Sequence, residues 1–443
     1  MRPYPIGNGT VSPRVPKEFA ALMDALQLEG SNTDALLALD DAEWLRLLEF
    51  CDLSHLALAL SQVDLAKAPE WVRSRLNRNV CDNARRFELV RAAYIEAAAA
   101  LRHAGVPHVV LKGFTQCPDY AGDPRLRFQS DIDIYCLQQQ IETAQAALMR
   151  IGYRPVDGTD YSRADHVPSL SRPGSWKWRG NHYDPEMPPG IELHFCFWNE
   201  RVNLIEIPEV GQFWGRRERR RLGGMDFCGL NGADHLGYLS LHILRGVLCG
   251  DWVVHHVFEL ARFLHTRSRD VEFWSQWHDG HSSNLRSLEA IAFCLARSWF
   301  SCALPELARV EADRLPQARQ EWLRRFGGSP LEVMFRHNKD GKLLQLLLAT
   351  SRTSRKSALL GAILPHHVAG PDETDVGMKN RRPVRLNASR YVKYVAYLVD
   401  RLVANCAANA SFLLHGLKLW LSTRALSAQF WLLVGASLFW PRR

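Results

Sequence analysis

Residues 105–136 read GVPHVVLKGFTQCPDYAGDPRLRFQSDIDIYC and carry the strongest structural signal in the chain. The run 108–112 is rich in β-branched residues and ends at Gly113, which is typical of a strand that enters a tight turn. A second short apolar segment covers residues 131–136. With a helical pattern before them and mixed segments after them, these runs predict an α/β unit over residues 105–200.

Asp131 and Asp133 are the most informative pair in this stretch. Side chains two positions apart on a strand point to the same face, so both carboxylates should project together while the apolar residues pack on the other side. Two anions this close repel each other, and burying either without a partner is costly. The pair therefore predicts a bound divalent cation, and oxygen ligands favour Mg²⁺ or Mn²⁺.

A third carboxylate lies on a later strand-like segment, 190–198. Glu192 and His194 share one face of that segment, and apolar residues occupy the other. If the segment lies beside residues 131–136, Glu192 joins the acidic patch. Three carboxylates can hold two metal ions that align a hydroxyl with a nucleotide α-phosphate. His194 could contact substrate or orient Glu192, or it could have only a structural role.

Four residues near the aspartates are candidates for phosphate binding. Gly113, at the end of its strand, allows backbone N–H groups to approach a triphosphate, and Lys112 adds a positive charge. Arg125 and Arg127 lie just before the acidic pair and could clamp phosphate oxygens.

In this order, the features resemble the nucleotidyltransferase superfamily of DNA polymerase β. The closer resemblance is to a bacterial nucleotidyltransferase family with a Leu-Lys-Gly motif. It rests on residues 105–113, on Arg127 ahead of the aspartates, and on the Glu-Leu-His run at 192–194. It covers roughly residues 80–265. Phe114 follows Gly113 where the wider superfamily has a second Gly or Ser.

The resemblance implies a fold, a site and an activity. The implied fold is α+β, with a polymerase-β-like core of mixed sheet and helices between N- and C-terminal helical regions. Asp131, Asp133 and Glu192 would hold Mg²⁺ or Mn²⁺ and act in catalysis. Lys112, Gly113, Arg125, Arg127 and His194 would bind a nucleoside triphosphate such as ATP. The enzyme would move a nucleoside monophosphate to a hydroxyl acceptor, either a small molecule, a protein or RNA, and release pyrophosphate. The alternative is a catalytically inactive nucleotide-binding or interaction module with a membrane-surface tail.

Shifts in composition and pattern predict six segments along the chain. They are a flexible lead (1–16), an N-terminal helical region (17–80), the nucleotidyltransferase core (81–229), a helical domain (230–364), a linker (365–387) and a basic apolar helical tail (388–443). Within them the pattern predicts a long helix over 82–103 and a strand near 175–183.

Composition sets broad limits on these interpretations. The 443 residues are 47% hydrophobic and 23% charged, which excludes a disordered chain, and the net charge of +8 suits an anionic partner. The ten cysteines form no C-x-x-C pair, and the N-terminus has no apolar signal-peptide core. We therefore expect reduced thiols and a cytoplasmic protein.

Three segments leave alternatives open. Residues 425–440 are uncharged and slightly short for a membrane span, so they could form a docked helix, an interfacial helix on the inner membrane surface or a true span. The arginine-rich segment 216–221 suggests a solvated turn or a phosphate or lipid contact. His235 and His242 lie seven residues apart on one helical face, which suggests packing, phosphate contact or a phosphohydrolase-type metal centre.

Overall fold

The two aspartates lie on a central strand of a mixed sheet. The structure, a computed structural model, describes residues 15–156, 165–363 and 388–423. Across these residues the sheet has seven strands in the order β3-β4-β5-β2-β1-β7-β6. β2 (Asp131–Tyr135) pairs with β1 (Val109–Val110) in antiparallel orientation and with β5 (Gly190–His194) in parallel orientation. Together with its many helices, this sheet confirms the predicted α+β class.

The outer strands complete the sheet at both edges. They are β3 (Arg154–Pro155), β4 (Leu170–Ser171), β6 (Glu218–Leu222) and β7 (Met225–Gly229). β6 and β7 form a hairpin whose two loop residues, Gly223 and Gly224, have φ of 54° and 78°. Both values are easy only for glycine, and they match the turns that join hairpin strands. The arginine-rich segment predicted as a turn is therefore mostly strand β6, where charged side chains protect the sheet edge.

The strand predicted near 175–183 is wrong. These residues form a loop, although all of them are described. Side chains tie the loop to neighbouring residues of the same segment, because Trp176 Nε1 donates to Asp184 at 3.0 Å and Arg179 pairs with Glu186 at 2.6 Å. The neighbour of β5 is instead the two-residue strand β4.

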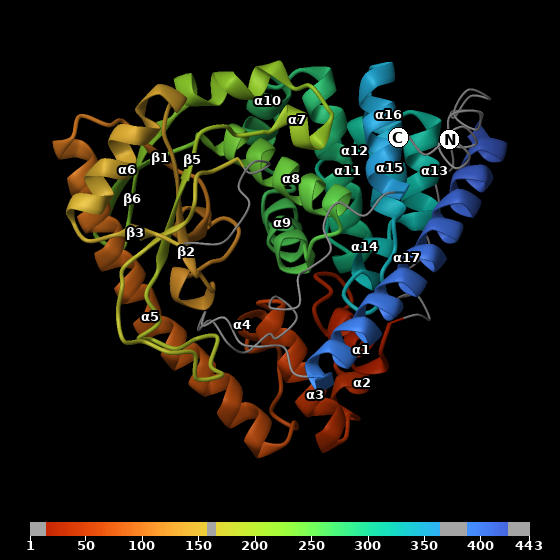
Figure 1. Cartoon of the computed structure of the whole chain (residues 1–443), viewed down its shortest axis with the longest axis horizontal. Coiled ribbons are helices and arrows are strands. Elements are labelled where there is room, and N and C mark those ends of the chain that lie inside the picture. Colours follow the sequence, from red (N-terminus) through yellow and green to blue (C-terminus); the bar gives the residue numbers. More distant parts are fainter. Residues whose placement is uncertain (1–14, 157–164, 364–387, 424–443) are drawn as a thin grey trace. The chain divides into compact units, whose positions relative to one another are not determined.

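A long helix, α5 (Glu70–His103), covers the apolar face of the sheet together with α6 (Ile141–Arg150) (Figure 1). The helix begins twelve residues before the predicted start, directly after Pro69, because Val72 and Leu76, four residues apart, extend its buried face. Its buried face packs with Ile132 and Ile134 of β2 in one hydrophobic cluster. Because side chains alternate along a strand, Asp131 and Asp133 lie on the face opposite to this cluster.

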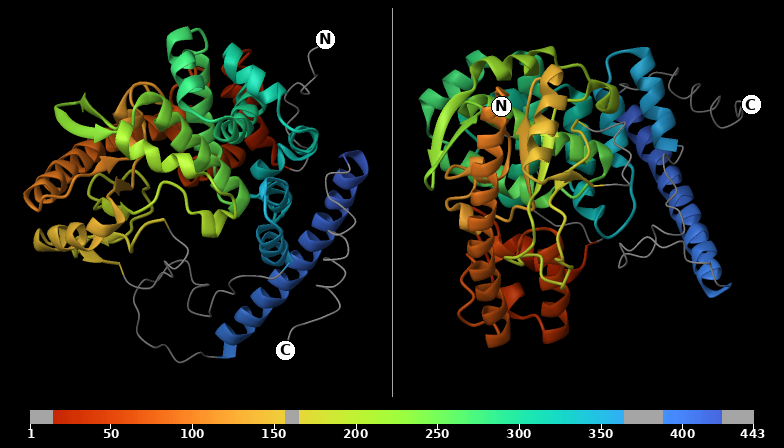
Figure 2. Two further views of the ribbon diagram at one scale, coloured as in Figure 1. Left: turned by 90° about the horizontal axis from the view of Figure 1, so that it is seen from above. Right: turned by 60° about the vertical axis from the view of Figure 1, so that its left-hand side comes forward.

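Short helices precede α5 in the region predicted to be helical. They are α1 (Lys17–Ala25), α2 (Asp34–Leu37), α3 (Asp41–Leu53) and α4 (Ala57–Leu60). The first half of α5 continues beyond the sheet and packs against α4 (Figure 2). α3 begins with a capping box between Asp40 and Glu43, which explains why it starts there.

Helices after the sheet cover its polar face. The first two are α8 (Gly232–Cys249) and α9 (Val254–Thr266), which follow α7 (Glu200–Asn203). They are succeeded by α10 (Val271–Gly280), α11 (Ser283–Phe300) and α12 (Glu306–Asp313). α8 reaches the residues that follow β1, since His235 Nε2 lies 3.1 Å from the carbonyl oxygen of Leu111.

The chain divides into two compact units. One holds the described residues up to Gly246 together with Trp252–Leu315, and it contains the sheet. The other holds Val247–Asp251 and the described residues from Pro316 onward, so the boundary lies inside the predicted 230–364 segment. Its helices are α13 (Gln317–Phe326), α14 (Ser329–Glu332), α15 (Asp340–Leu348), α16 (Arg352–Ile363) and α17 (Ala388–Thr423).

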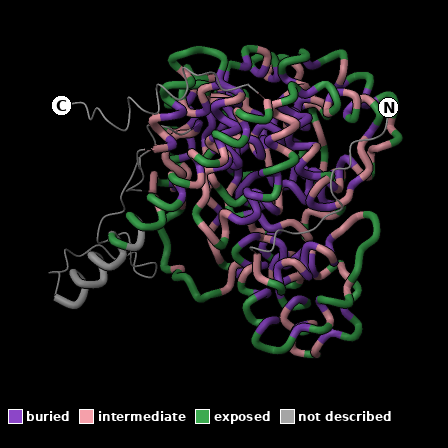
Figure 3. The backbone as a smooth tube through the Cα atoms, turned by 90° about the vertical axis from the view of Figure 1, so that its right-hand side faces the viewer, coloured by how far each residue is buried: buried purple, intermediate pink, exposed green. Residues whose placement is uncertain are grey.

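The described part of the tail is the helix α17. Phe412 and Leu419 are buried, while Leu402, Leu414 and Leu421 are exposed, so a narrow stripe packs against α13 and α15 (Figure 3). Among the described helices, none combines the length and the apolar character that crossing a membrane requires. Residues 425–440 and the predicted linker 365–387 lie outside the described residues, so their predicted roles remain predictions.

Candidate metal centre

The parallel pairing of β2 and β5 brings the predicted carboxylates together. In the register of the two strands, Asp133 is the partner of Glu192, and Asp131 is the partner of Gly190. A Cβ atom at Gly190 would lie 3.8 Å from Cβ of Asp131, so the absence of a side chain there leaves room beside the first aspartate. The sheet therefore places Asp131, Asp133 and Glu192 on one surface.

Asp133 is the centre of the most tightly connected group. Its Oδ1 atom lies 2.9 Å from Lys112 Nζ and 2.9 Å from His194 Nε2, and the residue is only 2% exposed. His194 Nε2 also lies 3.9 Å from Glu192 Oε2. Of the described residues, Asp133, Glu192 and His194 offer metal-type ligand atoms that all lie within 4.8 Å of one another. We call these three residues the carboxylate–histidine cluster.

The pKa values of the two aspartates shift in opposite directions, because Lys112 and His194 outweigh the effect of burial at Asp133. Burial raises the pKa of Asp131 to about 7, and the charges of Asp133 and Glu192 add to the effect. Burial would also raise the pKa of Asp133, but Lys112 and His194 hold it below its ordinary value. A cation at this site would relieve the same repulsion, and carboxylate and imidazole donors suit it.

A second set of side chains supports the cluster, and no sequence pattern predicted it. Ser169 Oγ donates to Glu192 Oε1 at 2.7 Å, and His166 Nε2 lies 3.7 Å from Glu192 Oε2. Both residues precede β4, and His166 also forms an isolated bridge with His194. Only an apolar strand pattern could have identified this segment, but β4 has two residues and is too short to show such a pattern.

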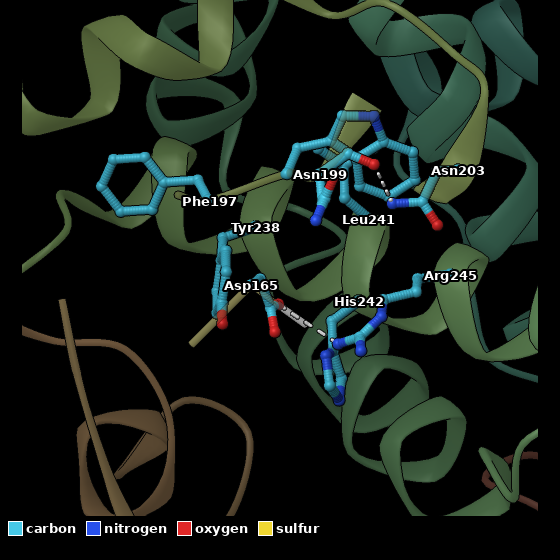
Figure 4. A pocket seen from close by; sticks show the side chains of 9 residues that line it. Asp165, Phe197, Asn199, Asn203, Tyr238, Leu241, His242 and Arg245 are labelled. Carbon is cyan, nitrogen blue, oxygen red and sulfur yellow. Dashed lines mark hydrogen bonds and ion pairs between the residues drawn. The ribbon is translucent and has the colours of Figure 1, made fainter. Parts of the chain in front are cut away.

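A polar pocket adjoins the cluster within the same unit. It is lined by Asp165, Phe197, Trp198, Asn199, Asn203, Tyr238, Leu241, His242 and Arg245 (Figure 4). Asp165 links the pocket to the cluster, because one of its oxygens lies 3.8 Å from His194 Nδ1 and 3.2 Å from Arg245. The His194 ring therefore lies between Asp133 and the pocket.

The predicted phosphate-binding residues differ in whether they contact the carboxylate–histidine cluster. Lys112 belongs to the site through its ion pair with Asp133. Gly113 begins the 3₁₀ turn Gly113–Gln116 with φ of 74°, and a Cβ there would come within 2.2 Å of the Gln129 side chain, so only glycine fits. The N–H groups of Gly113 and Phe114 donate to the side chains of Gln116 and Gln129.

The two arginines lie in different environments. Arg125 is exposed and pairs with Asp123 through two hydrogen bonds from Nε of 3.0 Å each. The side chain of Arg127 is 9% exposed, and its Nε lies 2.8 Å from Glu259 Oε1 of α9. Gln116 Nε2 also donates to Glu259 Oε2 at 2.9 Å. Arg127 therefore joins the turn after Lys112 to α9 through Glu259.

Acid should weaken the Arg127–Glu259 pair. Burial opposes ionisation of Glu259, but Arg127 and His256 lower its pKa to about 2. A carboxyl with a lowered pKa stabilises the fold above its unfolded value, near 4.5, and loses that contribution as pH falls toward 2. The contribution is about 3 kcal/mol, since each pKa unit corresponds to about 1.4 kcal/mol.

Denaturant unfolding of Glu259→Gln measured between pH 7 and pH 3 tests this prediction. The variant should be less stable than the wild type by about 3–5 kcal/mol at pH 7, because Arg127 keeps a buried charge without a partner. The difference should shrink as the pH falls below about 4.5. Glu70→Gln is the matched control, since the Glu70 side chain is exposed in its contacts with Arg73 and Ser74. A difference that stays constant with pH would contradict the prediction.

The histidines of α8 and α9 pack inside the unit. His242 Nε2 lies 3.3 Å from His256 Nε2, and the rings of His255 and His55 lie 5.0 Å apart. Burial lowers the pKa of each of these four histidines, so they are neutral near pH 7. Within the described part of the chain these histidines form no metal-type group, so the phosphohydrolase interpretation finds no support.

Arg86 is a further buried residue near the site that the sequence patterns did not indicate. Arg86 of α5 is 1% exposed and donates to the carbonyl oxygens of Gln129 at 3.0 Å and Met187 at 2.6 Å. These carbonyls flank the starts of β2 and β5, so Arg86 holds together the two segments that lead into the site. An arginine in a polar helix gives no signal of such a role.

The carboxylates thus lie on two adjacent central strands of a mixed α+β sheet, and Lys112, two residues after β1, contacts one of them. Residues 40–301 match the model of a family described as uncharacterised nucleotidyltransferase, and the chain belongs to this family. The match starts at residue 40, so it includes much of the helical region that the sequence motifs left outside the resemblance. No curated protein and no solved structure matches the chain.

Proposed function

We propose that the chain is a metal-dependent nucleotidyltransferase that moves a nucleoside monophosphate from a triphosphate to a hydroxyl acceptor. The observation that carries the proposal is the register of β2 and β5, which pairs Asp133 with Glu192 beside Asp131. Family membership supports transfer of this general kind. The ligand types favour Mg²⁺ or Mn²⁺.

The proposed reaction breaks one bond and forms one. The acceptor oxygen attacks the α-phosphorus, the bond to the bridging oxygen breaks, and pyrophosphate leaves. Asp131, Asp133 and Glu192 would hold the divalent cation, which when bound supplies charge stabilisation to the phosphate oxygens. Glu192 accepts the hydroxyl proton in this scheme. Lys112, whose Nζ lies 2.9 Å from Asp133 Oδ1, would bind the triphosphate.

The other residues predicted to contact phosphate differ in how easily a phosphate could reach them. Arg125 is exposed, so a phosphate can compete with Asp123 for its guanidinium. Arg127 would have to leave Glu259 to reach a phosphate, so we assign it the positioning of the turn at Gly113. His194 lies inside the cluster, so we assign it a role beside the cation rather than at the phosphates.

An inactive binding module is the second candidate, and one observation favours it. Lys112 and His194 already contact Asp133, so the buried carboxylate has partners without a cation. Such a protein would bind a nucleotide without turnover. It would show no Mn²⁺ site that depends on Asp133.

Labelled transfer in a cell extract tests the proposal and identifies the acceptor class. The protein is incubated with each α-³²P-labelled nucleoside triphosphate, Mg²⁺ or Mn²⁺ and extract, and label is followed into protein, RNA and small molecules. The wild type should transfer label, and the double variant Asp131→Asn/Asp133→Asn should not. Asp226→Asn, at an exposed carboxylate, is the matched control. Equal transfer by the double variant would refute the proposal.

A further inference from the structure

His194 occupies a position that a carboxylate would take in an all-oxygen metal site. It is 2% exposed, and its Nε2 atom lies between Asp133 Oδ1 and Glu192 Oε2, at 2.9 and 3.9 Å. This nitrogen therefore points into the space that both carboxylates face. A cation held there by Asp133 and Glu192 has His194 Nε2 as its nearest third donor.

The other ring nitrogen points at a second carboxylate. His194 Nδ1 is buried and has no hydrogen-bond partner, and Asp165 Oδ2 lies 3.8 Å away. Asp165 is 7% exposed, and its Oδ1 atom is also buried without a hydrogen-bond partner. Buried polar atoms normally have partners. His194 Nδ1 and Asp165 Oδ1 both lack one, whereas Asp165 Oδ2, the oxygen 3.8 Å from Nδ1, accepts from Arg245. The loose His194–Asp165 contact is therefore one that a ligand on the other ring nitrogen would complete.

Asp165 is held firmly in this position. Its carbonyl oxygen accepts a hydrogen bond from the N–H of Phe195 at 3.0 Å, which fixes its backbone beside β5. Its carboxylate accepts from Arg245 of α8 at 3.2 Å (Figure 4). The carboxylate therefore has a cationic partner on the pocket side and the His194 ring on the cluster side.

We propose that His194 is a ligand of the cation through Nε2 and that Asp165 orients it through Nδ1. A histidine that binds a metal through one nitrogen carries its proton on the other, and a carboxylate commonly accepts that proton. Asp165 is the carboxylate in the right place. The inference rests on the proposed function for the presence of a cation, and it adds a histidine ligand and a positioning residue to the proposed carboxylates.

A nitrogen ligand also changes which metal is preferred. Imidazole binds first-row transition metals better than it binds Mg²⁺, which prefers oxygen donors. The site should therefore bind Mn²⁺ more tightly than Mg²⁺. Replacing His194 with glutamine, which offers an oxygen, should reduce this preference.

Electron paramagnetic resonance of Mn²⁺ bound to the full chain tests the ligand assignment without a substrate. Spin-echo modulation from a directly bound ¹⁴N nucleus should be present in the wild type and change when the protein is labelled with ¹⁵N-histidine. The modulation should be absent in His194→Gln and present in His166→Gln, because His166 is the other histidine near Glu192. Asp165→Asn should weaken Mn²⁺ binding about 10- to 100-fold while the modulation remains.

The outcomes separate this inference from the proposed function. Bound Mn²⁺ without histidine modulation in the wild type overturns the inference even when nucleotidyl transfer is intact. Modulation that survives in His194→Gln and is lost in His166→Gln also overturns it. Histidine modulation from His194 supports the inference even when no acceptor is found and transfer is absent. The isotope experiment uses the native protein, so poor folding of a variant cannot decide the result.

Discussion

Asp133→Asn should reduce nucleotidyl transfer by roughly 1,000-fold, since removing one group that stabilises transition-state charge lowers kcat about 10²- to 10³-fold. It should also abolish the Mn²⁺ site, because Asp133 is the carboxylate that touches both His194 and Lys112. The measurements are steady-state transfer with a saturating triphosphate and a Mn²⁺ titration. Asp226→Asn, in an exposed pair, should leave both unchanged.

The same substitution should affect stability, and this effect has to be separated from the chemistry. Lys112 has a side chain that is only 16% exposed, so Asp133→Asn leaves its charge buried with a weaker partner. Removing one member of a buried pair costs about 3–5 kcal/mol. Adding Lys112→Met removes that charge, so the double variant should recover most of the lost stability.

Chemical unfolding and Mn²⁺ titration of the double variant then give a clear comparison. A protein of nearly wild-type stability that binds no Mn²⁺ shows that Asp133 acts through the cation. Retained Mn²⁺ binding in Lys112→Met/Asp133→Asn would contradict the assignment of Asp133 as a ligand. Stability equal to the wild type in the single variant would contradict the predicted importance of its pair with Lys112.

The two-residue period of strands explains why the site could be predicted from sequence. Asp131 and Asp133 share a face for the same reason that Glu192 and His194 do, and each pair needs only its own strand. That the two strands are neighbours could not be deduced from the alternation. The pairing depends on how the chain returns between Cys136 and Gly190, which is a long-range property of packing.

The residues that support the site could not be predicted either, because their contacts also depend on long-range packing. Asp165 lies on a segment without strong periodicity, and Glu259 follows Arg127 by more than a hundred residues. Spacing predicted two arginines near the aspartates, but it carries no information about their partners. Arg127 pairs with Glu259 at 2.8 Å, whereas Arg125 remains exposed beside Asp123.

Arg86 is the residue outside the cluster whose replacement should have the largest effect on stability. Besides the carbonyls of Gln129 and Met187, it donates to those of Ser130 at 3.3 Å and Asp184 at 3.4 Å. Burial lowers its pKa to about 10, against the opposing charges of Asp131 and Asp184, so the guanidinium stays charged near pH 7. One buried cation thus donates to four carbonyl oxygens near the starts of two neighbouring strands, and those of Ser130 and Asp184 also accept backbone N–H groups.

Arg86→Met keeps much of the volume and removes every donor. It should lower the free energy of unfolding by about 3–6 kcal/mol, because each buried acceptor that loses its donor costs about 1–3 kcal/mol. Arg91→Met lies on the same helix, where Arg91 forms an exposed pair with Glu88, and should change stability by less than about 0.5 kcal/mol. Guanidinium unfolding of both variants measures the difference.

The variant should also weaken Mn²⁺ binding before it unfolds. Ser130 directly precedes Asp131, and Met187 lies three residues before Gly190, the partner of Asp131 in the sheet. Without Arg86, the segments that enter β2 and β5 lose their common donor, so the carboxylates lose their fixed spacing. A stability loss below about 1 kcal/mol, smaller than removal of one buried donor should cause, would contradict this role. Retention of wild-type Mn²⁺ affinity in a destabilised but folded Arg86→Met would show that the strands hold their register without this arginine.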